Sequence, residues 1–262
     1  MSNALRNFEV NYQEVASLLE AYDIVKASSG QKSGRFKLDH LTKSALVILC
    51  SAWEVYVEEV TEECMATILS QCNSFKDDRL KHLHASLRDK AEAIFAEKKQ
   101  GVLSERAMEM IEKSWDENVS DFLNESLAKF NTPKSADITK LFKQFLGLPT
   151  GKIPWVEGHC WDYQFDKEIK KGPYINDMVS RRGSIAHASG AAISLHKAEI
   201  DEYCEVVKRQ VLKIDLWLYN AMKEKYQKVG WRAEKQKFKE LTTNRSSLPR
   251  FKDRIKRHKG EK

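Results

Sequence analysis

The amino-acid sequence predicts an all-α protein. Along most of its 262 residues the apolar positions recur at spacings of three and four, as on the buried face of an amphipathic helix. Segments that alternate apolar and polar residues, as strands do, are weak almost everywhere. With 42% hydrophobic residues, the chain has enough apolar side chains for a substantial core. We therefore expect a single helical bundle over residues 1–230, followed by a basic tail over residues 231–262.

Two long helices are expected at the start of the chain. The first covers about residues 4–26 and ends at the serine- and glycine-rich run of residues 28–34, which favours a loop. The second covers about residues 38–71 and is expected to be the central helix of the core. Its apolar positions follow one another at alternating steps of four and three residues: Leu46, Cys50, Trp53, Val57, Val60 and Cys64.

The middle of the chain, about residues 75–154, is more charged and is predicted to be an inserted helical region. Its expected helices lie at about residues 75–99, 103–130 and 135–146. The run from Gly147 to Pro154 then carries the glycines and prolines that are typical of turns. Residues 155–171, which hold two Trp, one Tyr and one Phe, are not assigned to an element.

Two further helices are expected near the end of the bundle. One begins at Pro173, a residue favoured in the first turn, and runs to about Ala188, where Ser189 and Gly190 end it. The other covers about residues 196–228 and suits either a bundle core or a dimer interface. Its apolar seam follows strict four-three spacing: Ile200, Cys204, Val207, Val211, Ile214, Leu218 and Ala221.

The net charge of +6 belongs to the tail. Residues 231–262 hold 12 Lys and Arg against 4 Asp and Glu, a net charge of +8, which leaves −2 for residues 1–230. Such a tail is suited to a phosphate backbone through counterion release, and a merely solvated, disordered end explains the same composition equally well.

Membrane and secretory segments are not expected. The longest apolar stretch, Ser44 to Trp53, is well short of the roughly 20 residues that a membrane-spanning helix needs. The first residues lack a basic patch followed by an apolar run and a small-residue cleavage site, as a secretory signal would have. We expect a cytoplasmic protein.

Neither a metal site nor another cofactor is expected. His82 and His84 are one residue apart on a helix and so point in different directions, and His159-Cys160 has no matching second pair. The cysteines are odd in number and form no C-x-x-C pair, so they are expected to be reduced thiols in the core. They are Cys50, Cys64, Cys72, Cys160 and Cys204.

The segment from Arg181 to His187 is the candidate working site. On the helix that starts at Pro173, Arg182 shares a face with Ile175, Met178 and Ile185 and so interrupts an apolar stripe. Because a guanidinium is costly to bury unless it is paired or lines a cleft, this position favours an anion-binding role. Arg181 is a rival for that role, although its favoured position is the surface.

The spacing alone does not pair Arg182 with His187. Five residues correspond to about 140° around an ideal helix, so the two side chains do not stack. The length of the Arg side chain, a local distortion at Gly183, or a second subunit is needed to bring them together. An arginine that stabilises negative charge beside a proton-moving histidine suits phosphodiester cleavage. RNA is the easier substrate because its 2′-hydroxyl is an internal nucleophile and needs no cluster of metal-binding carboxylates.

Two phrases of the sequence resemble the HEPN superfamily. Arg182-Gly183-Ser184-Ile185-Ala186-His187 is similar to its motif of an Arg and a His separated by four to six residues. Ser51-Ala52-Trp53-Glu54-Val55-Tyr56-Val57-Glu58-Glu59 resembles the S-x-W-E-x-Y-x-E-E phrase of the RiboL-PSP-HEPN branch. The resemblance covers about residues 38–70 and 172–225, and it leaves the middle helices and the tail unexplained.

The resemblance implies a HEPN-like bundle that forms a homodimer, with two Arg/His motifs facing each other across a cleft as a metal-independent endoribonuclease. It implies that Arg182 stabilises the phosphate, that His187 transfers a proton or holds the 2′-hydroxyl, and that Glu54 positions one of them. Arg181 and Ser184 are the further supporting candidates, whereas Trp53 is expected in the core. Gly183 stands where the family's phrase usually has a polar residue, most often Asn, and loosens the helix by up to about 1 kcal/mol relative to Ala.

The biological setting that the resemblance implies is a bacterial conflict system, either toxin–antitoxin or phage defence. The expected partners are then an RNA substrate and an antitoxin or defence protein. One alternative is a non-catalytic HEPN-like module that binds RNA or a protein. Another is an aromatic interaction scaffold centred on Trp155 to Phe165, which makes no use of the Arg/His segment.

Overall fold

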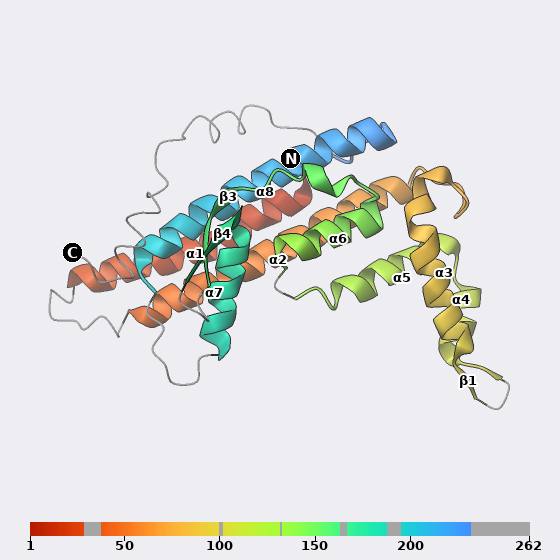
Figure 1. Ribbon diagram of the computed structural model, residues 1–262, viewed down its shortest axis with the longest axis horizontal. Helices are drawn as coiled ribbons and strands as arrows, with labels where there is room; N and C mark the ends of the chain where they lie inside the picture. Colours follow the sequence, from red (N-terminus) through yellow and green to blue (C-terminus); the bar gives the residue numbers. More distant parts are fainter. Residues whose placement is uncertain (29–37, 100–101, 132, 163–166, 188–194, 232–262) are drawn as a thin grey trace.

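The computed structural model describes residues 1–28, 38–99, 102–131, 133–162, 167–187 and 195–231. Within these residues the chain forms eight α-helices and two small antiparallel hairpins, which confirms the predicted all-α class (Figure 1). The helices are α1 (Asn3–Ser28), α2 (Asp39–Leu69), α3 (Lys81–Ala96), α4 (Glu105–Glu112), α5 (Trp115–Leu127), α6 (Ser135–Leu146), α7 (Ile175–His187) and α8 (Lys197–Tyr226). The short 3-10 turns η3 (Asp78–Leu80) and η4 (Thr150–Lys152) precede α3 and follow α6.

Helix α2 is the centre of the bundle. It contacts α1, α5, α6, α7 and α8, and in Figure 1 the long helices α1, α2 and α8 run side by side. The six apolar positions expected on its buried face are all at most 2% exposed, which confirms its predicted place in the core. Helix α1 packs antiparallel to it, because Asn3 at the start of α1 donates its N–H to Glu63 Oε1 at 2.9 Å, near the end of α2.

The apolar seam of α8 is buried in the core of the single chain. Six of its seven positions, from Ile200 to Leu218, are buried, and Ala221 is half-buried against the same core. Helix α8 contacts α1, α2 and α7. The seam is therefore part of the bundle core, and its alternative interpretation as a dimer interface is wrong.

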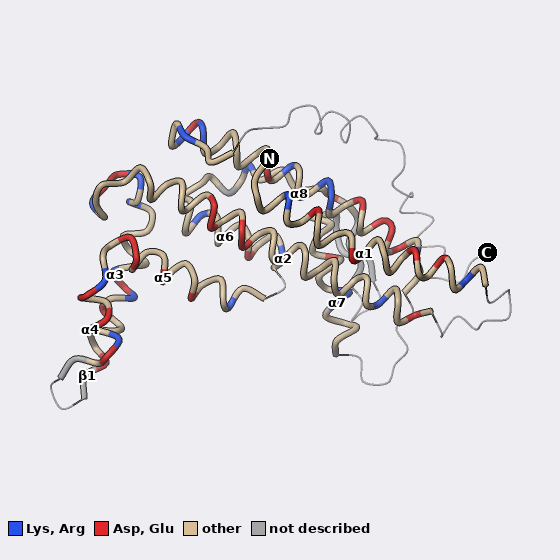
Figure 2. The backbone as a smooth tube through the Cα atoms, turned by 180° about the vertical axis from the view of Figure 1, so that it is seen from behind, with Lys and Arg blue, Asp and Glu red and all other residues tan. Residues whose placement is uncertain are grey.

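The predicted helix at residues 103–130 is wrong, because two helices occupy this range. Lys113 is extended, with ψ of 148°, and Ser114 starts α5 as its N-cap. The Ser114 N–H donates to Glu117 Oε2 at 2.8 Å, and the Ser114 Oγ accepts from the Glu117 N–H, so the two residues form a capping box. Helices α3 and α4, joined by the hairpin of β1 (Lys98–Lys99) and β2 (Val102–Leu103), extend from one end of the bundle in both Figure 1 and Figure 2.

Helix α6 matches its predicted bounds, and Gly147 ends it in the left-handed conformation with φ of 57°. A Cβ at this position would meet the His82 ring at 2.7 Å, so Gly is needed for both conformation and space. The unassigned aromatic segment then forms a hairpin of β3 (Glu157–Asp162) and β4 (Lys167–Pro173), with an irregularity between Gly158 and Cys160. Its Tyr163 and Phe165 lie outside the described residues.

Four of the cysteines are free and buried, namely Cys50, Cys64, Cys72 and Cys204, which confirms that they serve as core thiols. The Cys160 side chain lies outside the described residues. None of the helices in the described ranges combines the length and apolar character that crossing a membrane requires. The division into a domain and an insertion at residues 75–154 stays a prediction.

Candidate active site

Helix α7 carries the Arg/His segment and is held in place at its first turn. Pro173 does not start this helix, as the sequence suggests, because it is the last residue of β4 and pairs with Glu157. The Tyr174 N–H donates to the Val156 carbonyl at 2.8 Å, and its hydroxyl donates to Glu202 of α8. The helix therefore begins at Ile175, from a residue that is bonded to both the hairpin and α8.

A second pair of hydrogen bonds joins the start of α7 to the start of α6. The Ser135 N–H donates to Asn176 Oδ1 at 2.8 Å, and Asn176 Nδ2 donates to Ser135 Oγ at 2.9 Å. Because both residues lie in first turns, the amide satisfies a backbone N–H that α6 itself cannot bond. These contacts orient the helix that presents the candidate site.

Arg181 is the more buried of the two adjacent arginines, with 6% exposure, so its expected surface position is wrong. It follows the buried Asp177 by one helical turn, a spacing at which opposite charges are neighbours. The Tyr203 hydroxyl of α8 donates to Asp177 Oδ2 at 2.7 Å. Arg181 thus belongs to a buried polar region between α7 and α8.

Arg182 is half-buried and lies close to α2. The apolar residues of its stripe, Ile175 and Met178, are each 1% exposed, and Ile185 packs against the core. Burial raises the pKa of the Cys50 thiol on α2 to about 12, while the Arg182 charge opposes this shift and the Glu54 charge adds to it. The two charged side chains therefore act on the same thiol from α7 and α2.

The rest of the Arg/His phrase is half-buried up to Ala186, which is exposed. The Ser184 hydroxyl donates to the Ser180 carbonyl at 3.0 Å, one turn earlier in the same helix. A Cβ at Gly183 would meet no atom within 4 Å, so this position has room for a side chain. His187 is the last residue of α7, and its side chain lies outside the described part of the structure.

The tryptophan-glutamate phrase on α2 supplies core residues, as predicted for Trp53. Trp53 and Tyr56 are fully buried and their rings stack with centroids 6.0 Å apart. Trp53 Nε1 donates to the Pro133 carbonyl at 3.3 Å, and the Tyr56 hydroxyl donates to the Val211 carbonyl of α8 at 3.1 Å. The aromatic part of the phrase therefore joins α2 to the segment before α6 and to α8, while Glu54 is half-buried.

The family model of RiboL-PSP-HEPN matches residues 10–220, which is most of the chain. The chain belongs to this family. The match includes both phrases that pointed to it and the middle helices that the resemblance left unexplained. Neither the comparison with curated proteins nor the comparison with solved structures gave a match.

A row of carboxyl groups that begins within the tryptophan-glutamate phrase was not singled out from the sequence. Glu54, Glu58 and Glu62 follow one another at steps of four, and therefore lie along one side of α2. Burial, and then the charges of Glu54 and Glu62, raise the pKa of Glu58 to about 7, and burial also raises the pKa of Glu62. The spacing of four is visible in the sequence, whereas the burial of these carboxyl groups and the contact of α2 with α7 are properties of the fold.

In the part of the chain that the structure describes, no three His, Cys, Asp or Glu side chains are grouped so that they could hold a metal ion. His82 Nε2 lies 2.6 Å from the Phe145 carbonyl, and His84 Nε2 lies 2.8 Å from the Phe75 carbonyl. The two imidazoles therefore contact different backbone carbonyls and do not face a common site. This HEPN domain therefore has a half-buried Arg182 on a helix that ends in a histidine, and that helix contacts α2, which carries Glu54.

Proposed function

We propose that this chain is an endoribonuclease in which Arg182 and His187 act on a phosphodiester of RNA. The observation that carries the proposal is the contact between α7, which bears the Arg/His phrase, and α2, which bears the tryptophan-glutamate phrase. Arg182 is half-buried at the edge of the core, where a guanidinium retains access to an anion. Membership of the HEPN-type family supports the same activity.

The proposed chemistry uses the nucleophile of the substrate itself. The His187 imidazole accepts the proton of the 2′-hydroxyl, and the 2′-oxygen forms a bond to phosphorus while the bond from phosphorus to the 5′-oxygen breaks. The leaving 5′-oxygen takes up a proton from the imidazolium so formed, so the products are a 2′,3′-cyclic phosphate and a 5′-hydroxyl. The Arg182 guanidinium balances the charge that develops on the non-bridging oxygens, and Glu54 positions that guanidinium. In this scheme no metal ion is required.

A homodimer is part of the proposal. Helix α7 lies at the periphery of the bundle in both Figure 1 and Figure 2, so a second copy has room to approach it. Two facing α7 helices would bring a second Arg/His motif to the same cleft. Light scattering after size exclusion checks this expectation, and a chain that is monomeric while it cleaves RNA would contradict it.

The activity is tested with His187→Ala. Wild-type chain should cleave single-stranded RNA in the presence of EDTA and leave 2′,3′-cyclic phosphate ends, and the variant should lose activity by about a hundredfold or more. His40→Ala, which changes an exposed histidine at the start of α2, is the matched control and should cleave like wild type. Equal cleavage by wild type and His187→Ala would refute the proposal, as would cleavage of an RNA whose 2′-hydroxyls are methylated.

The setting that we propose is a toxin of a toxin–antitoxin or phage-defence system, acting in the bacterial cytoplasm and restrained by a partner protein. Expression of wild type without a partner should then arrest growth, and expression of His187→Ala should not. The non-catalytic alternative predicts a different result. A chain that is harmless, and whose RNA affinity vanishes when residues 231–262 are removed, would be an RNA-binding module.

A further inference from the structure

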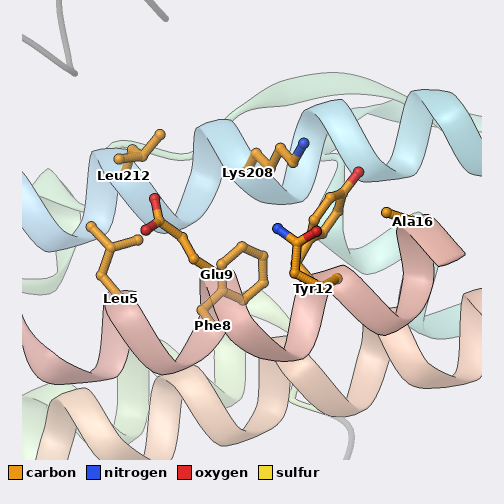
Figure 3. Close-up of a pocket in the computed structure, with 8 residues that line it drawn as sticks. Leu5, Phe8, Glu9, Tyr12, Ala16, Lys208 and Leu212 are labelled. Atoms are coloured by element: carbon orange, nitrogen blue, oxygen red, sulfur yellow. The ribbon is translucent and has the colours of Figure 1, made fainter.

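A groove of about 460 Å³ lies between the first half of α1 and the middle of α8, away from the Arg/His segment in sequence (Figure 3). Its floor is apolar, because Leu5 and Phe8 are 4% and 3% exposed and Leu212 is packed beside them. This volume falls in the range of roughly 300–1,000 Å³ that is typical of small-molecule sites, which are likewise mostly apolar with a few polar groups. The groove therefore has the size and character of a ligand site.

Lys208 provides a cation at one end of the groove. Its Nζ lies 3.9 Å from the centroid of the Tyr12 ring, so the ammonium sits on the face of the phenol. Within the described residues no carboxylate forms an ion pair with Lys208, whereas the neighbouring Arg209 pairs with Glu205 at 3.3 Å. The Lys208 ammonium can therefore pair with an anion that enters the groove, although Glu205 and Asp201 of α8 also act on the phenol beneath it.

The phenol beneath Lys208 does not supply that anion. Burial, and then the Cys204 thiol, raise the pKa of Tyr12 far above its usual range, so the ring stays neutral. Cation–π contact with a neutral ring is weaker than pairing with a carboxylate or sulfonate, and it leaves the ammonium free to make that pair as well.

Glu9 limits the kind of anion that fits. In Figure 3 its carboxylate lies beside Leu212, toward the opposite end of the groove from the Lys208 ammonium. A ligand with one anionic group can place it at Lys208 and keep its apolar body over Phe8. A polyanion that fills the groove meets the Glu9 charge and is repelled.

We propose that the groove between α1 and α8 binds a small amphiphile with an apolar body and a single anionic group. The anionic group pairs with Lys208 Nζ, and the apolar body lies on Phe8 and Leu212. This site is separate from the proposed active site and does not depend on ribonuclease activity.

The experiment uses the full chain and two probes, 8-anilinonaphthalene-1-sulfonate as a fluorescent reporter and straight-chain carboxylates as competitors. Decanoate should displace the reporter, and each added CH₂ from hexanoate to decanoate should strengthen competition roughly fourfold. Decylamine, which has the same chain and the opposite charge, should compete much more weakly. Lys208→Gln should weaken decanoate binding about fivefold to tenfold, and Glu9→Gln should strengthen it.

Lys223→Gln is the matched control, because Lys223 is an exposed lysine of the same helix outside the groove. It should bind decanoate like wild type, and all variants should retain the wild-type circular dichroism spectrum. Equal affinity of Lys208→Gln and wild type for decanoate would overturn the proposal. So would equal competition by decylamine and decanoate, or reporter fluorescence that none of the carboxylates displaces.

Discussion

The hydrogen bond from Tyr203 to Asp177 is expected to stabilise the helix that carries the candidate site. Tyr203 is fully buried, Asp177 is 1% exposed, and the two oxygens are 2.7 Å apart. Tyr203→Phe removes the hydroxyl and leaves the ring in place. The carboxyl group of α7 then loses a buried donor that no bulk water replaces.

The magnitude follows from the burial of this pair. A hydrogen bond to a charged group contributes about 1.5–3 kcal/mol to stability, so Tyr203→Phe should lower the free energy of unfolding by about 2 kcal/mol. For a chain of this size each kcal/mol corresponds to a shift in Tm of about 2–4 °C, so Tm should fall by about 4–8 °C.

Urea denaturation followed by tryptophan fluorescence measures this loss. Tyr219→Phe is the matched control, because Tyr219 is on the same helix and its hydroxyl has no hydrogen-bond partner among the described residues. The control should change stability by less than about 0.5 kcal/mol. A loss for Tyr203→Phe no greater than that of the control would refute the reasoning, and so would additive losses in the double variant with Asp177→Asn.

Two other predictions concern α7 and α2. Gly183→Ala should raise the free energy of unfolding by up to about 1 kcal/mol, because Ala favours the helix and its Cβ meets no atom within 4 Å. A lower free energy of unfolding in urea denaturation would show that the space around position 183 is not open. Glu58→Gln should raise stability at pH 8 by about 1 kcal/mol, after discounting for solvent screening, and should have little effect at pH 4. The sign follows because a carboxyl whose pKa is raised to about 7 on folding holds its proton more tightly in the folded state. The stability of the wild type therefore falls between about pH 4.5 and pH 7. A stability difference between wild type and Glu58→Gln that stays constant over this range would contradict the prediction.

The long helices could be predicted because each carries a continuous apolar seam. Helices α1, α2 and α8 begin and end within about two residues of the predicted bounds, since tertiary packing follows the same periodicity as the sequence. The break between α4 and α5 was missed even though Ser114 and Glu117 form a recognisable capping box, because the charged pattern continues across it. The hairpin of β3 and β4 was missed because, within the described residues, its two strands pair with each other and with no further strand, so no larger sheet imposes alternation.

The two adjacent arginines show what helical periodicity can and cannot predict. The periodicity places Arg182 on the apolar stripe, and Arg182 is half-buried near α2. Arg181 lies outside this stripe, so the periodicity does not predict its burial. Helix α7 packs against both α2 and α8, so a second face is buried, and Asp177 and Arg181 lie there. Which helices flank α7 is a property of the tertiary fold, and no local pattern contains it.

The row of Glu54, Glu58 and Glu62 places negative charge along one side of α2, near the helix that carries Arg182. An RNA strand bears one negative charge per nucleotide, so the strand would be repelled wherever it ran along this edge of α2. Under the proposed function, RNA held at Arg182 would therefore leave the site on the side away from the row. Because the pKa of Glu58 is about 7, mild acidification would partly neutralise the row and weaken its repulsion of the RNA strand, so the strand would be less restricted to the other side.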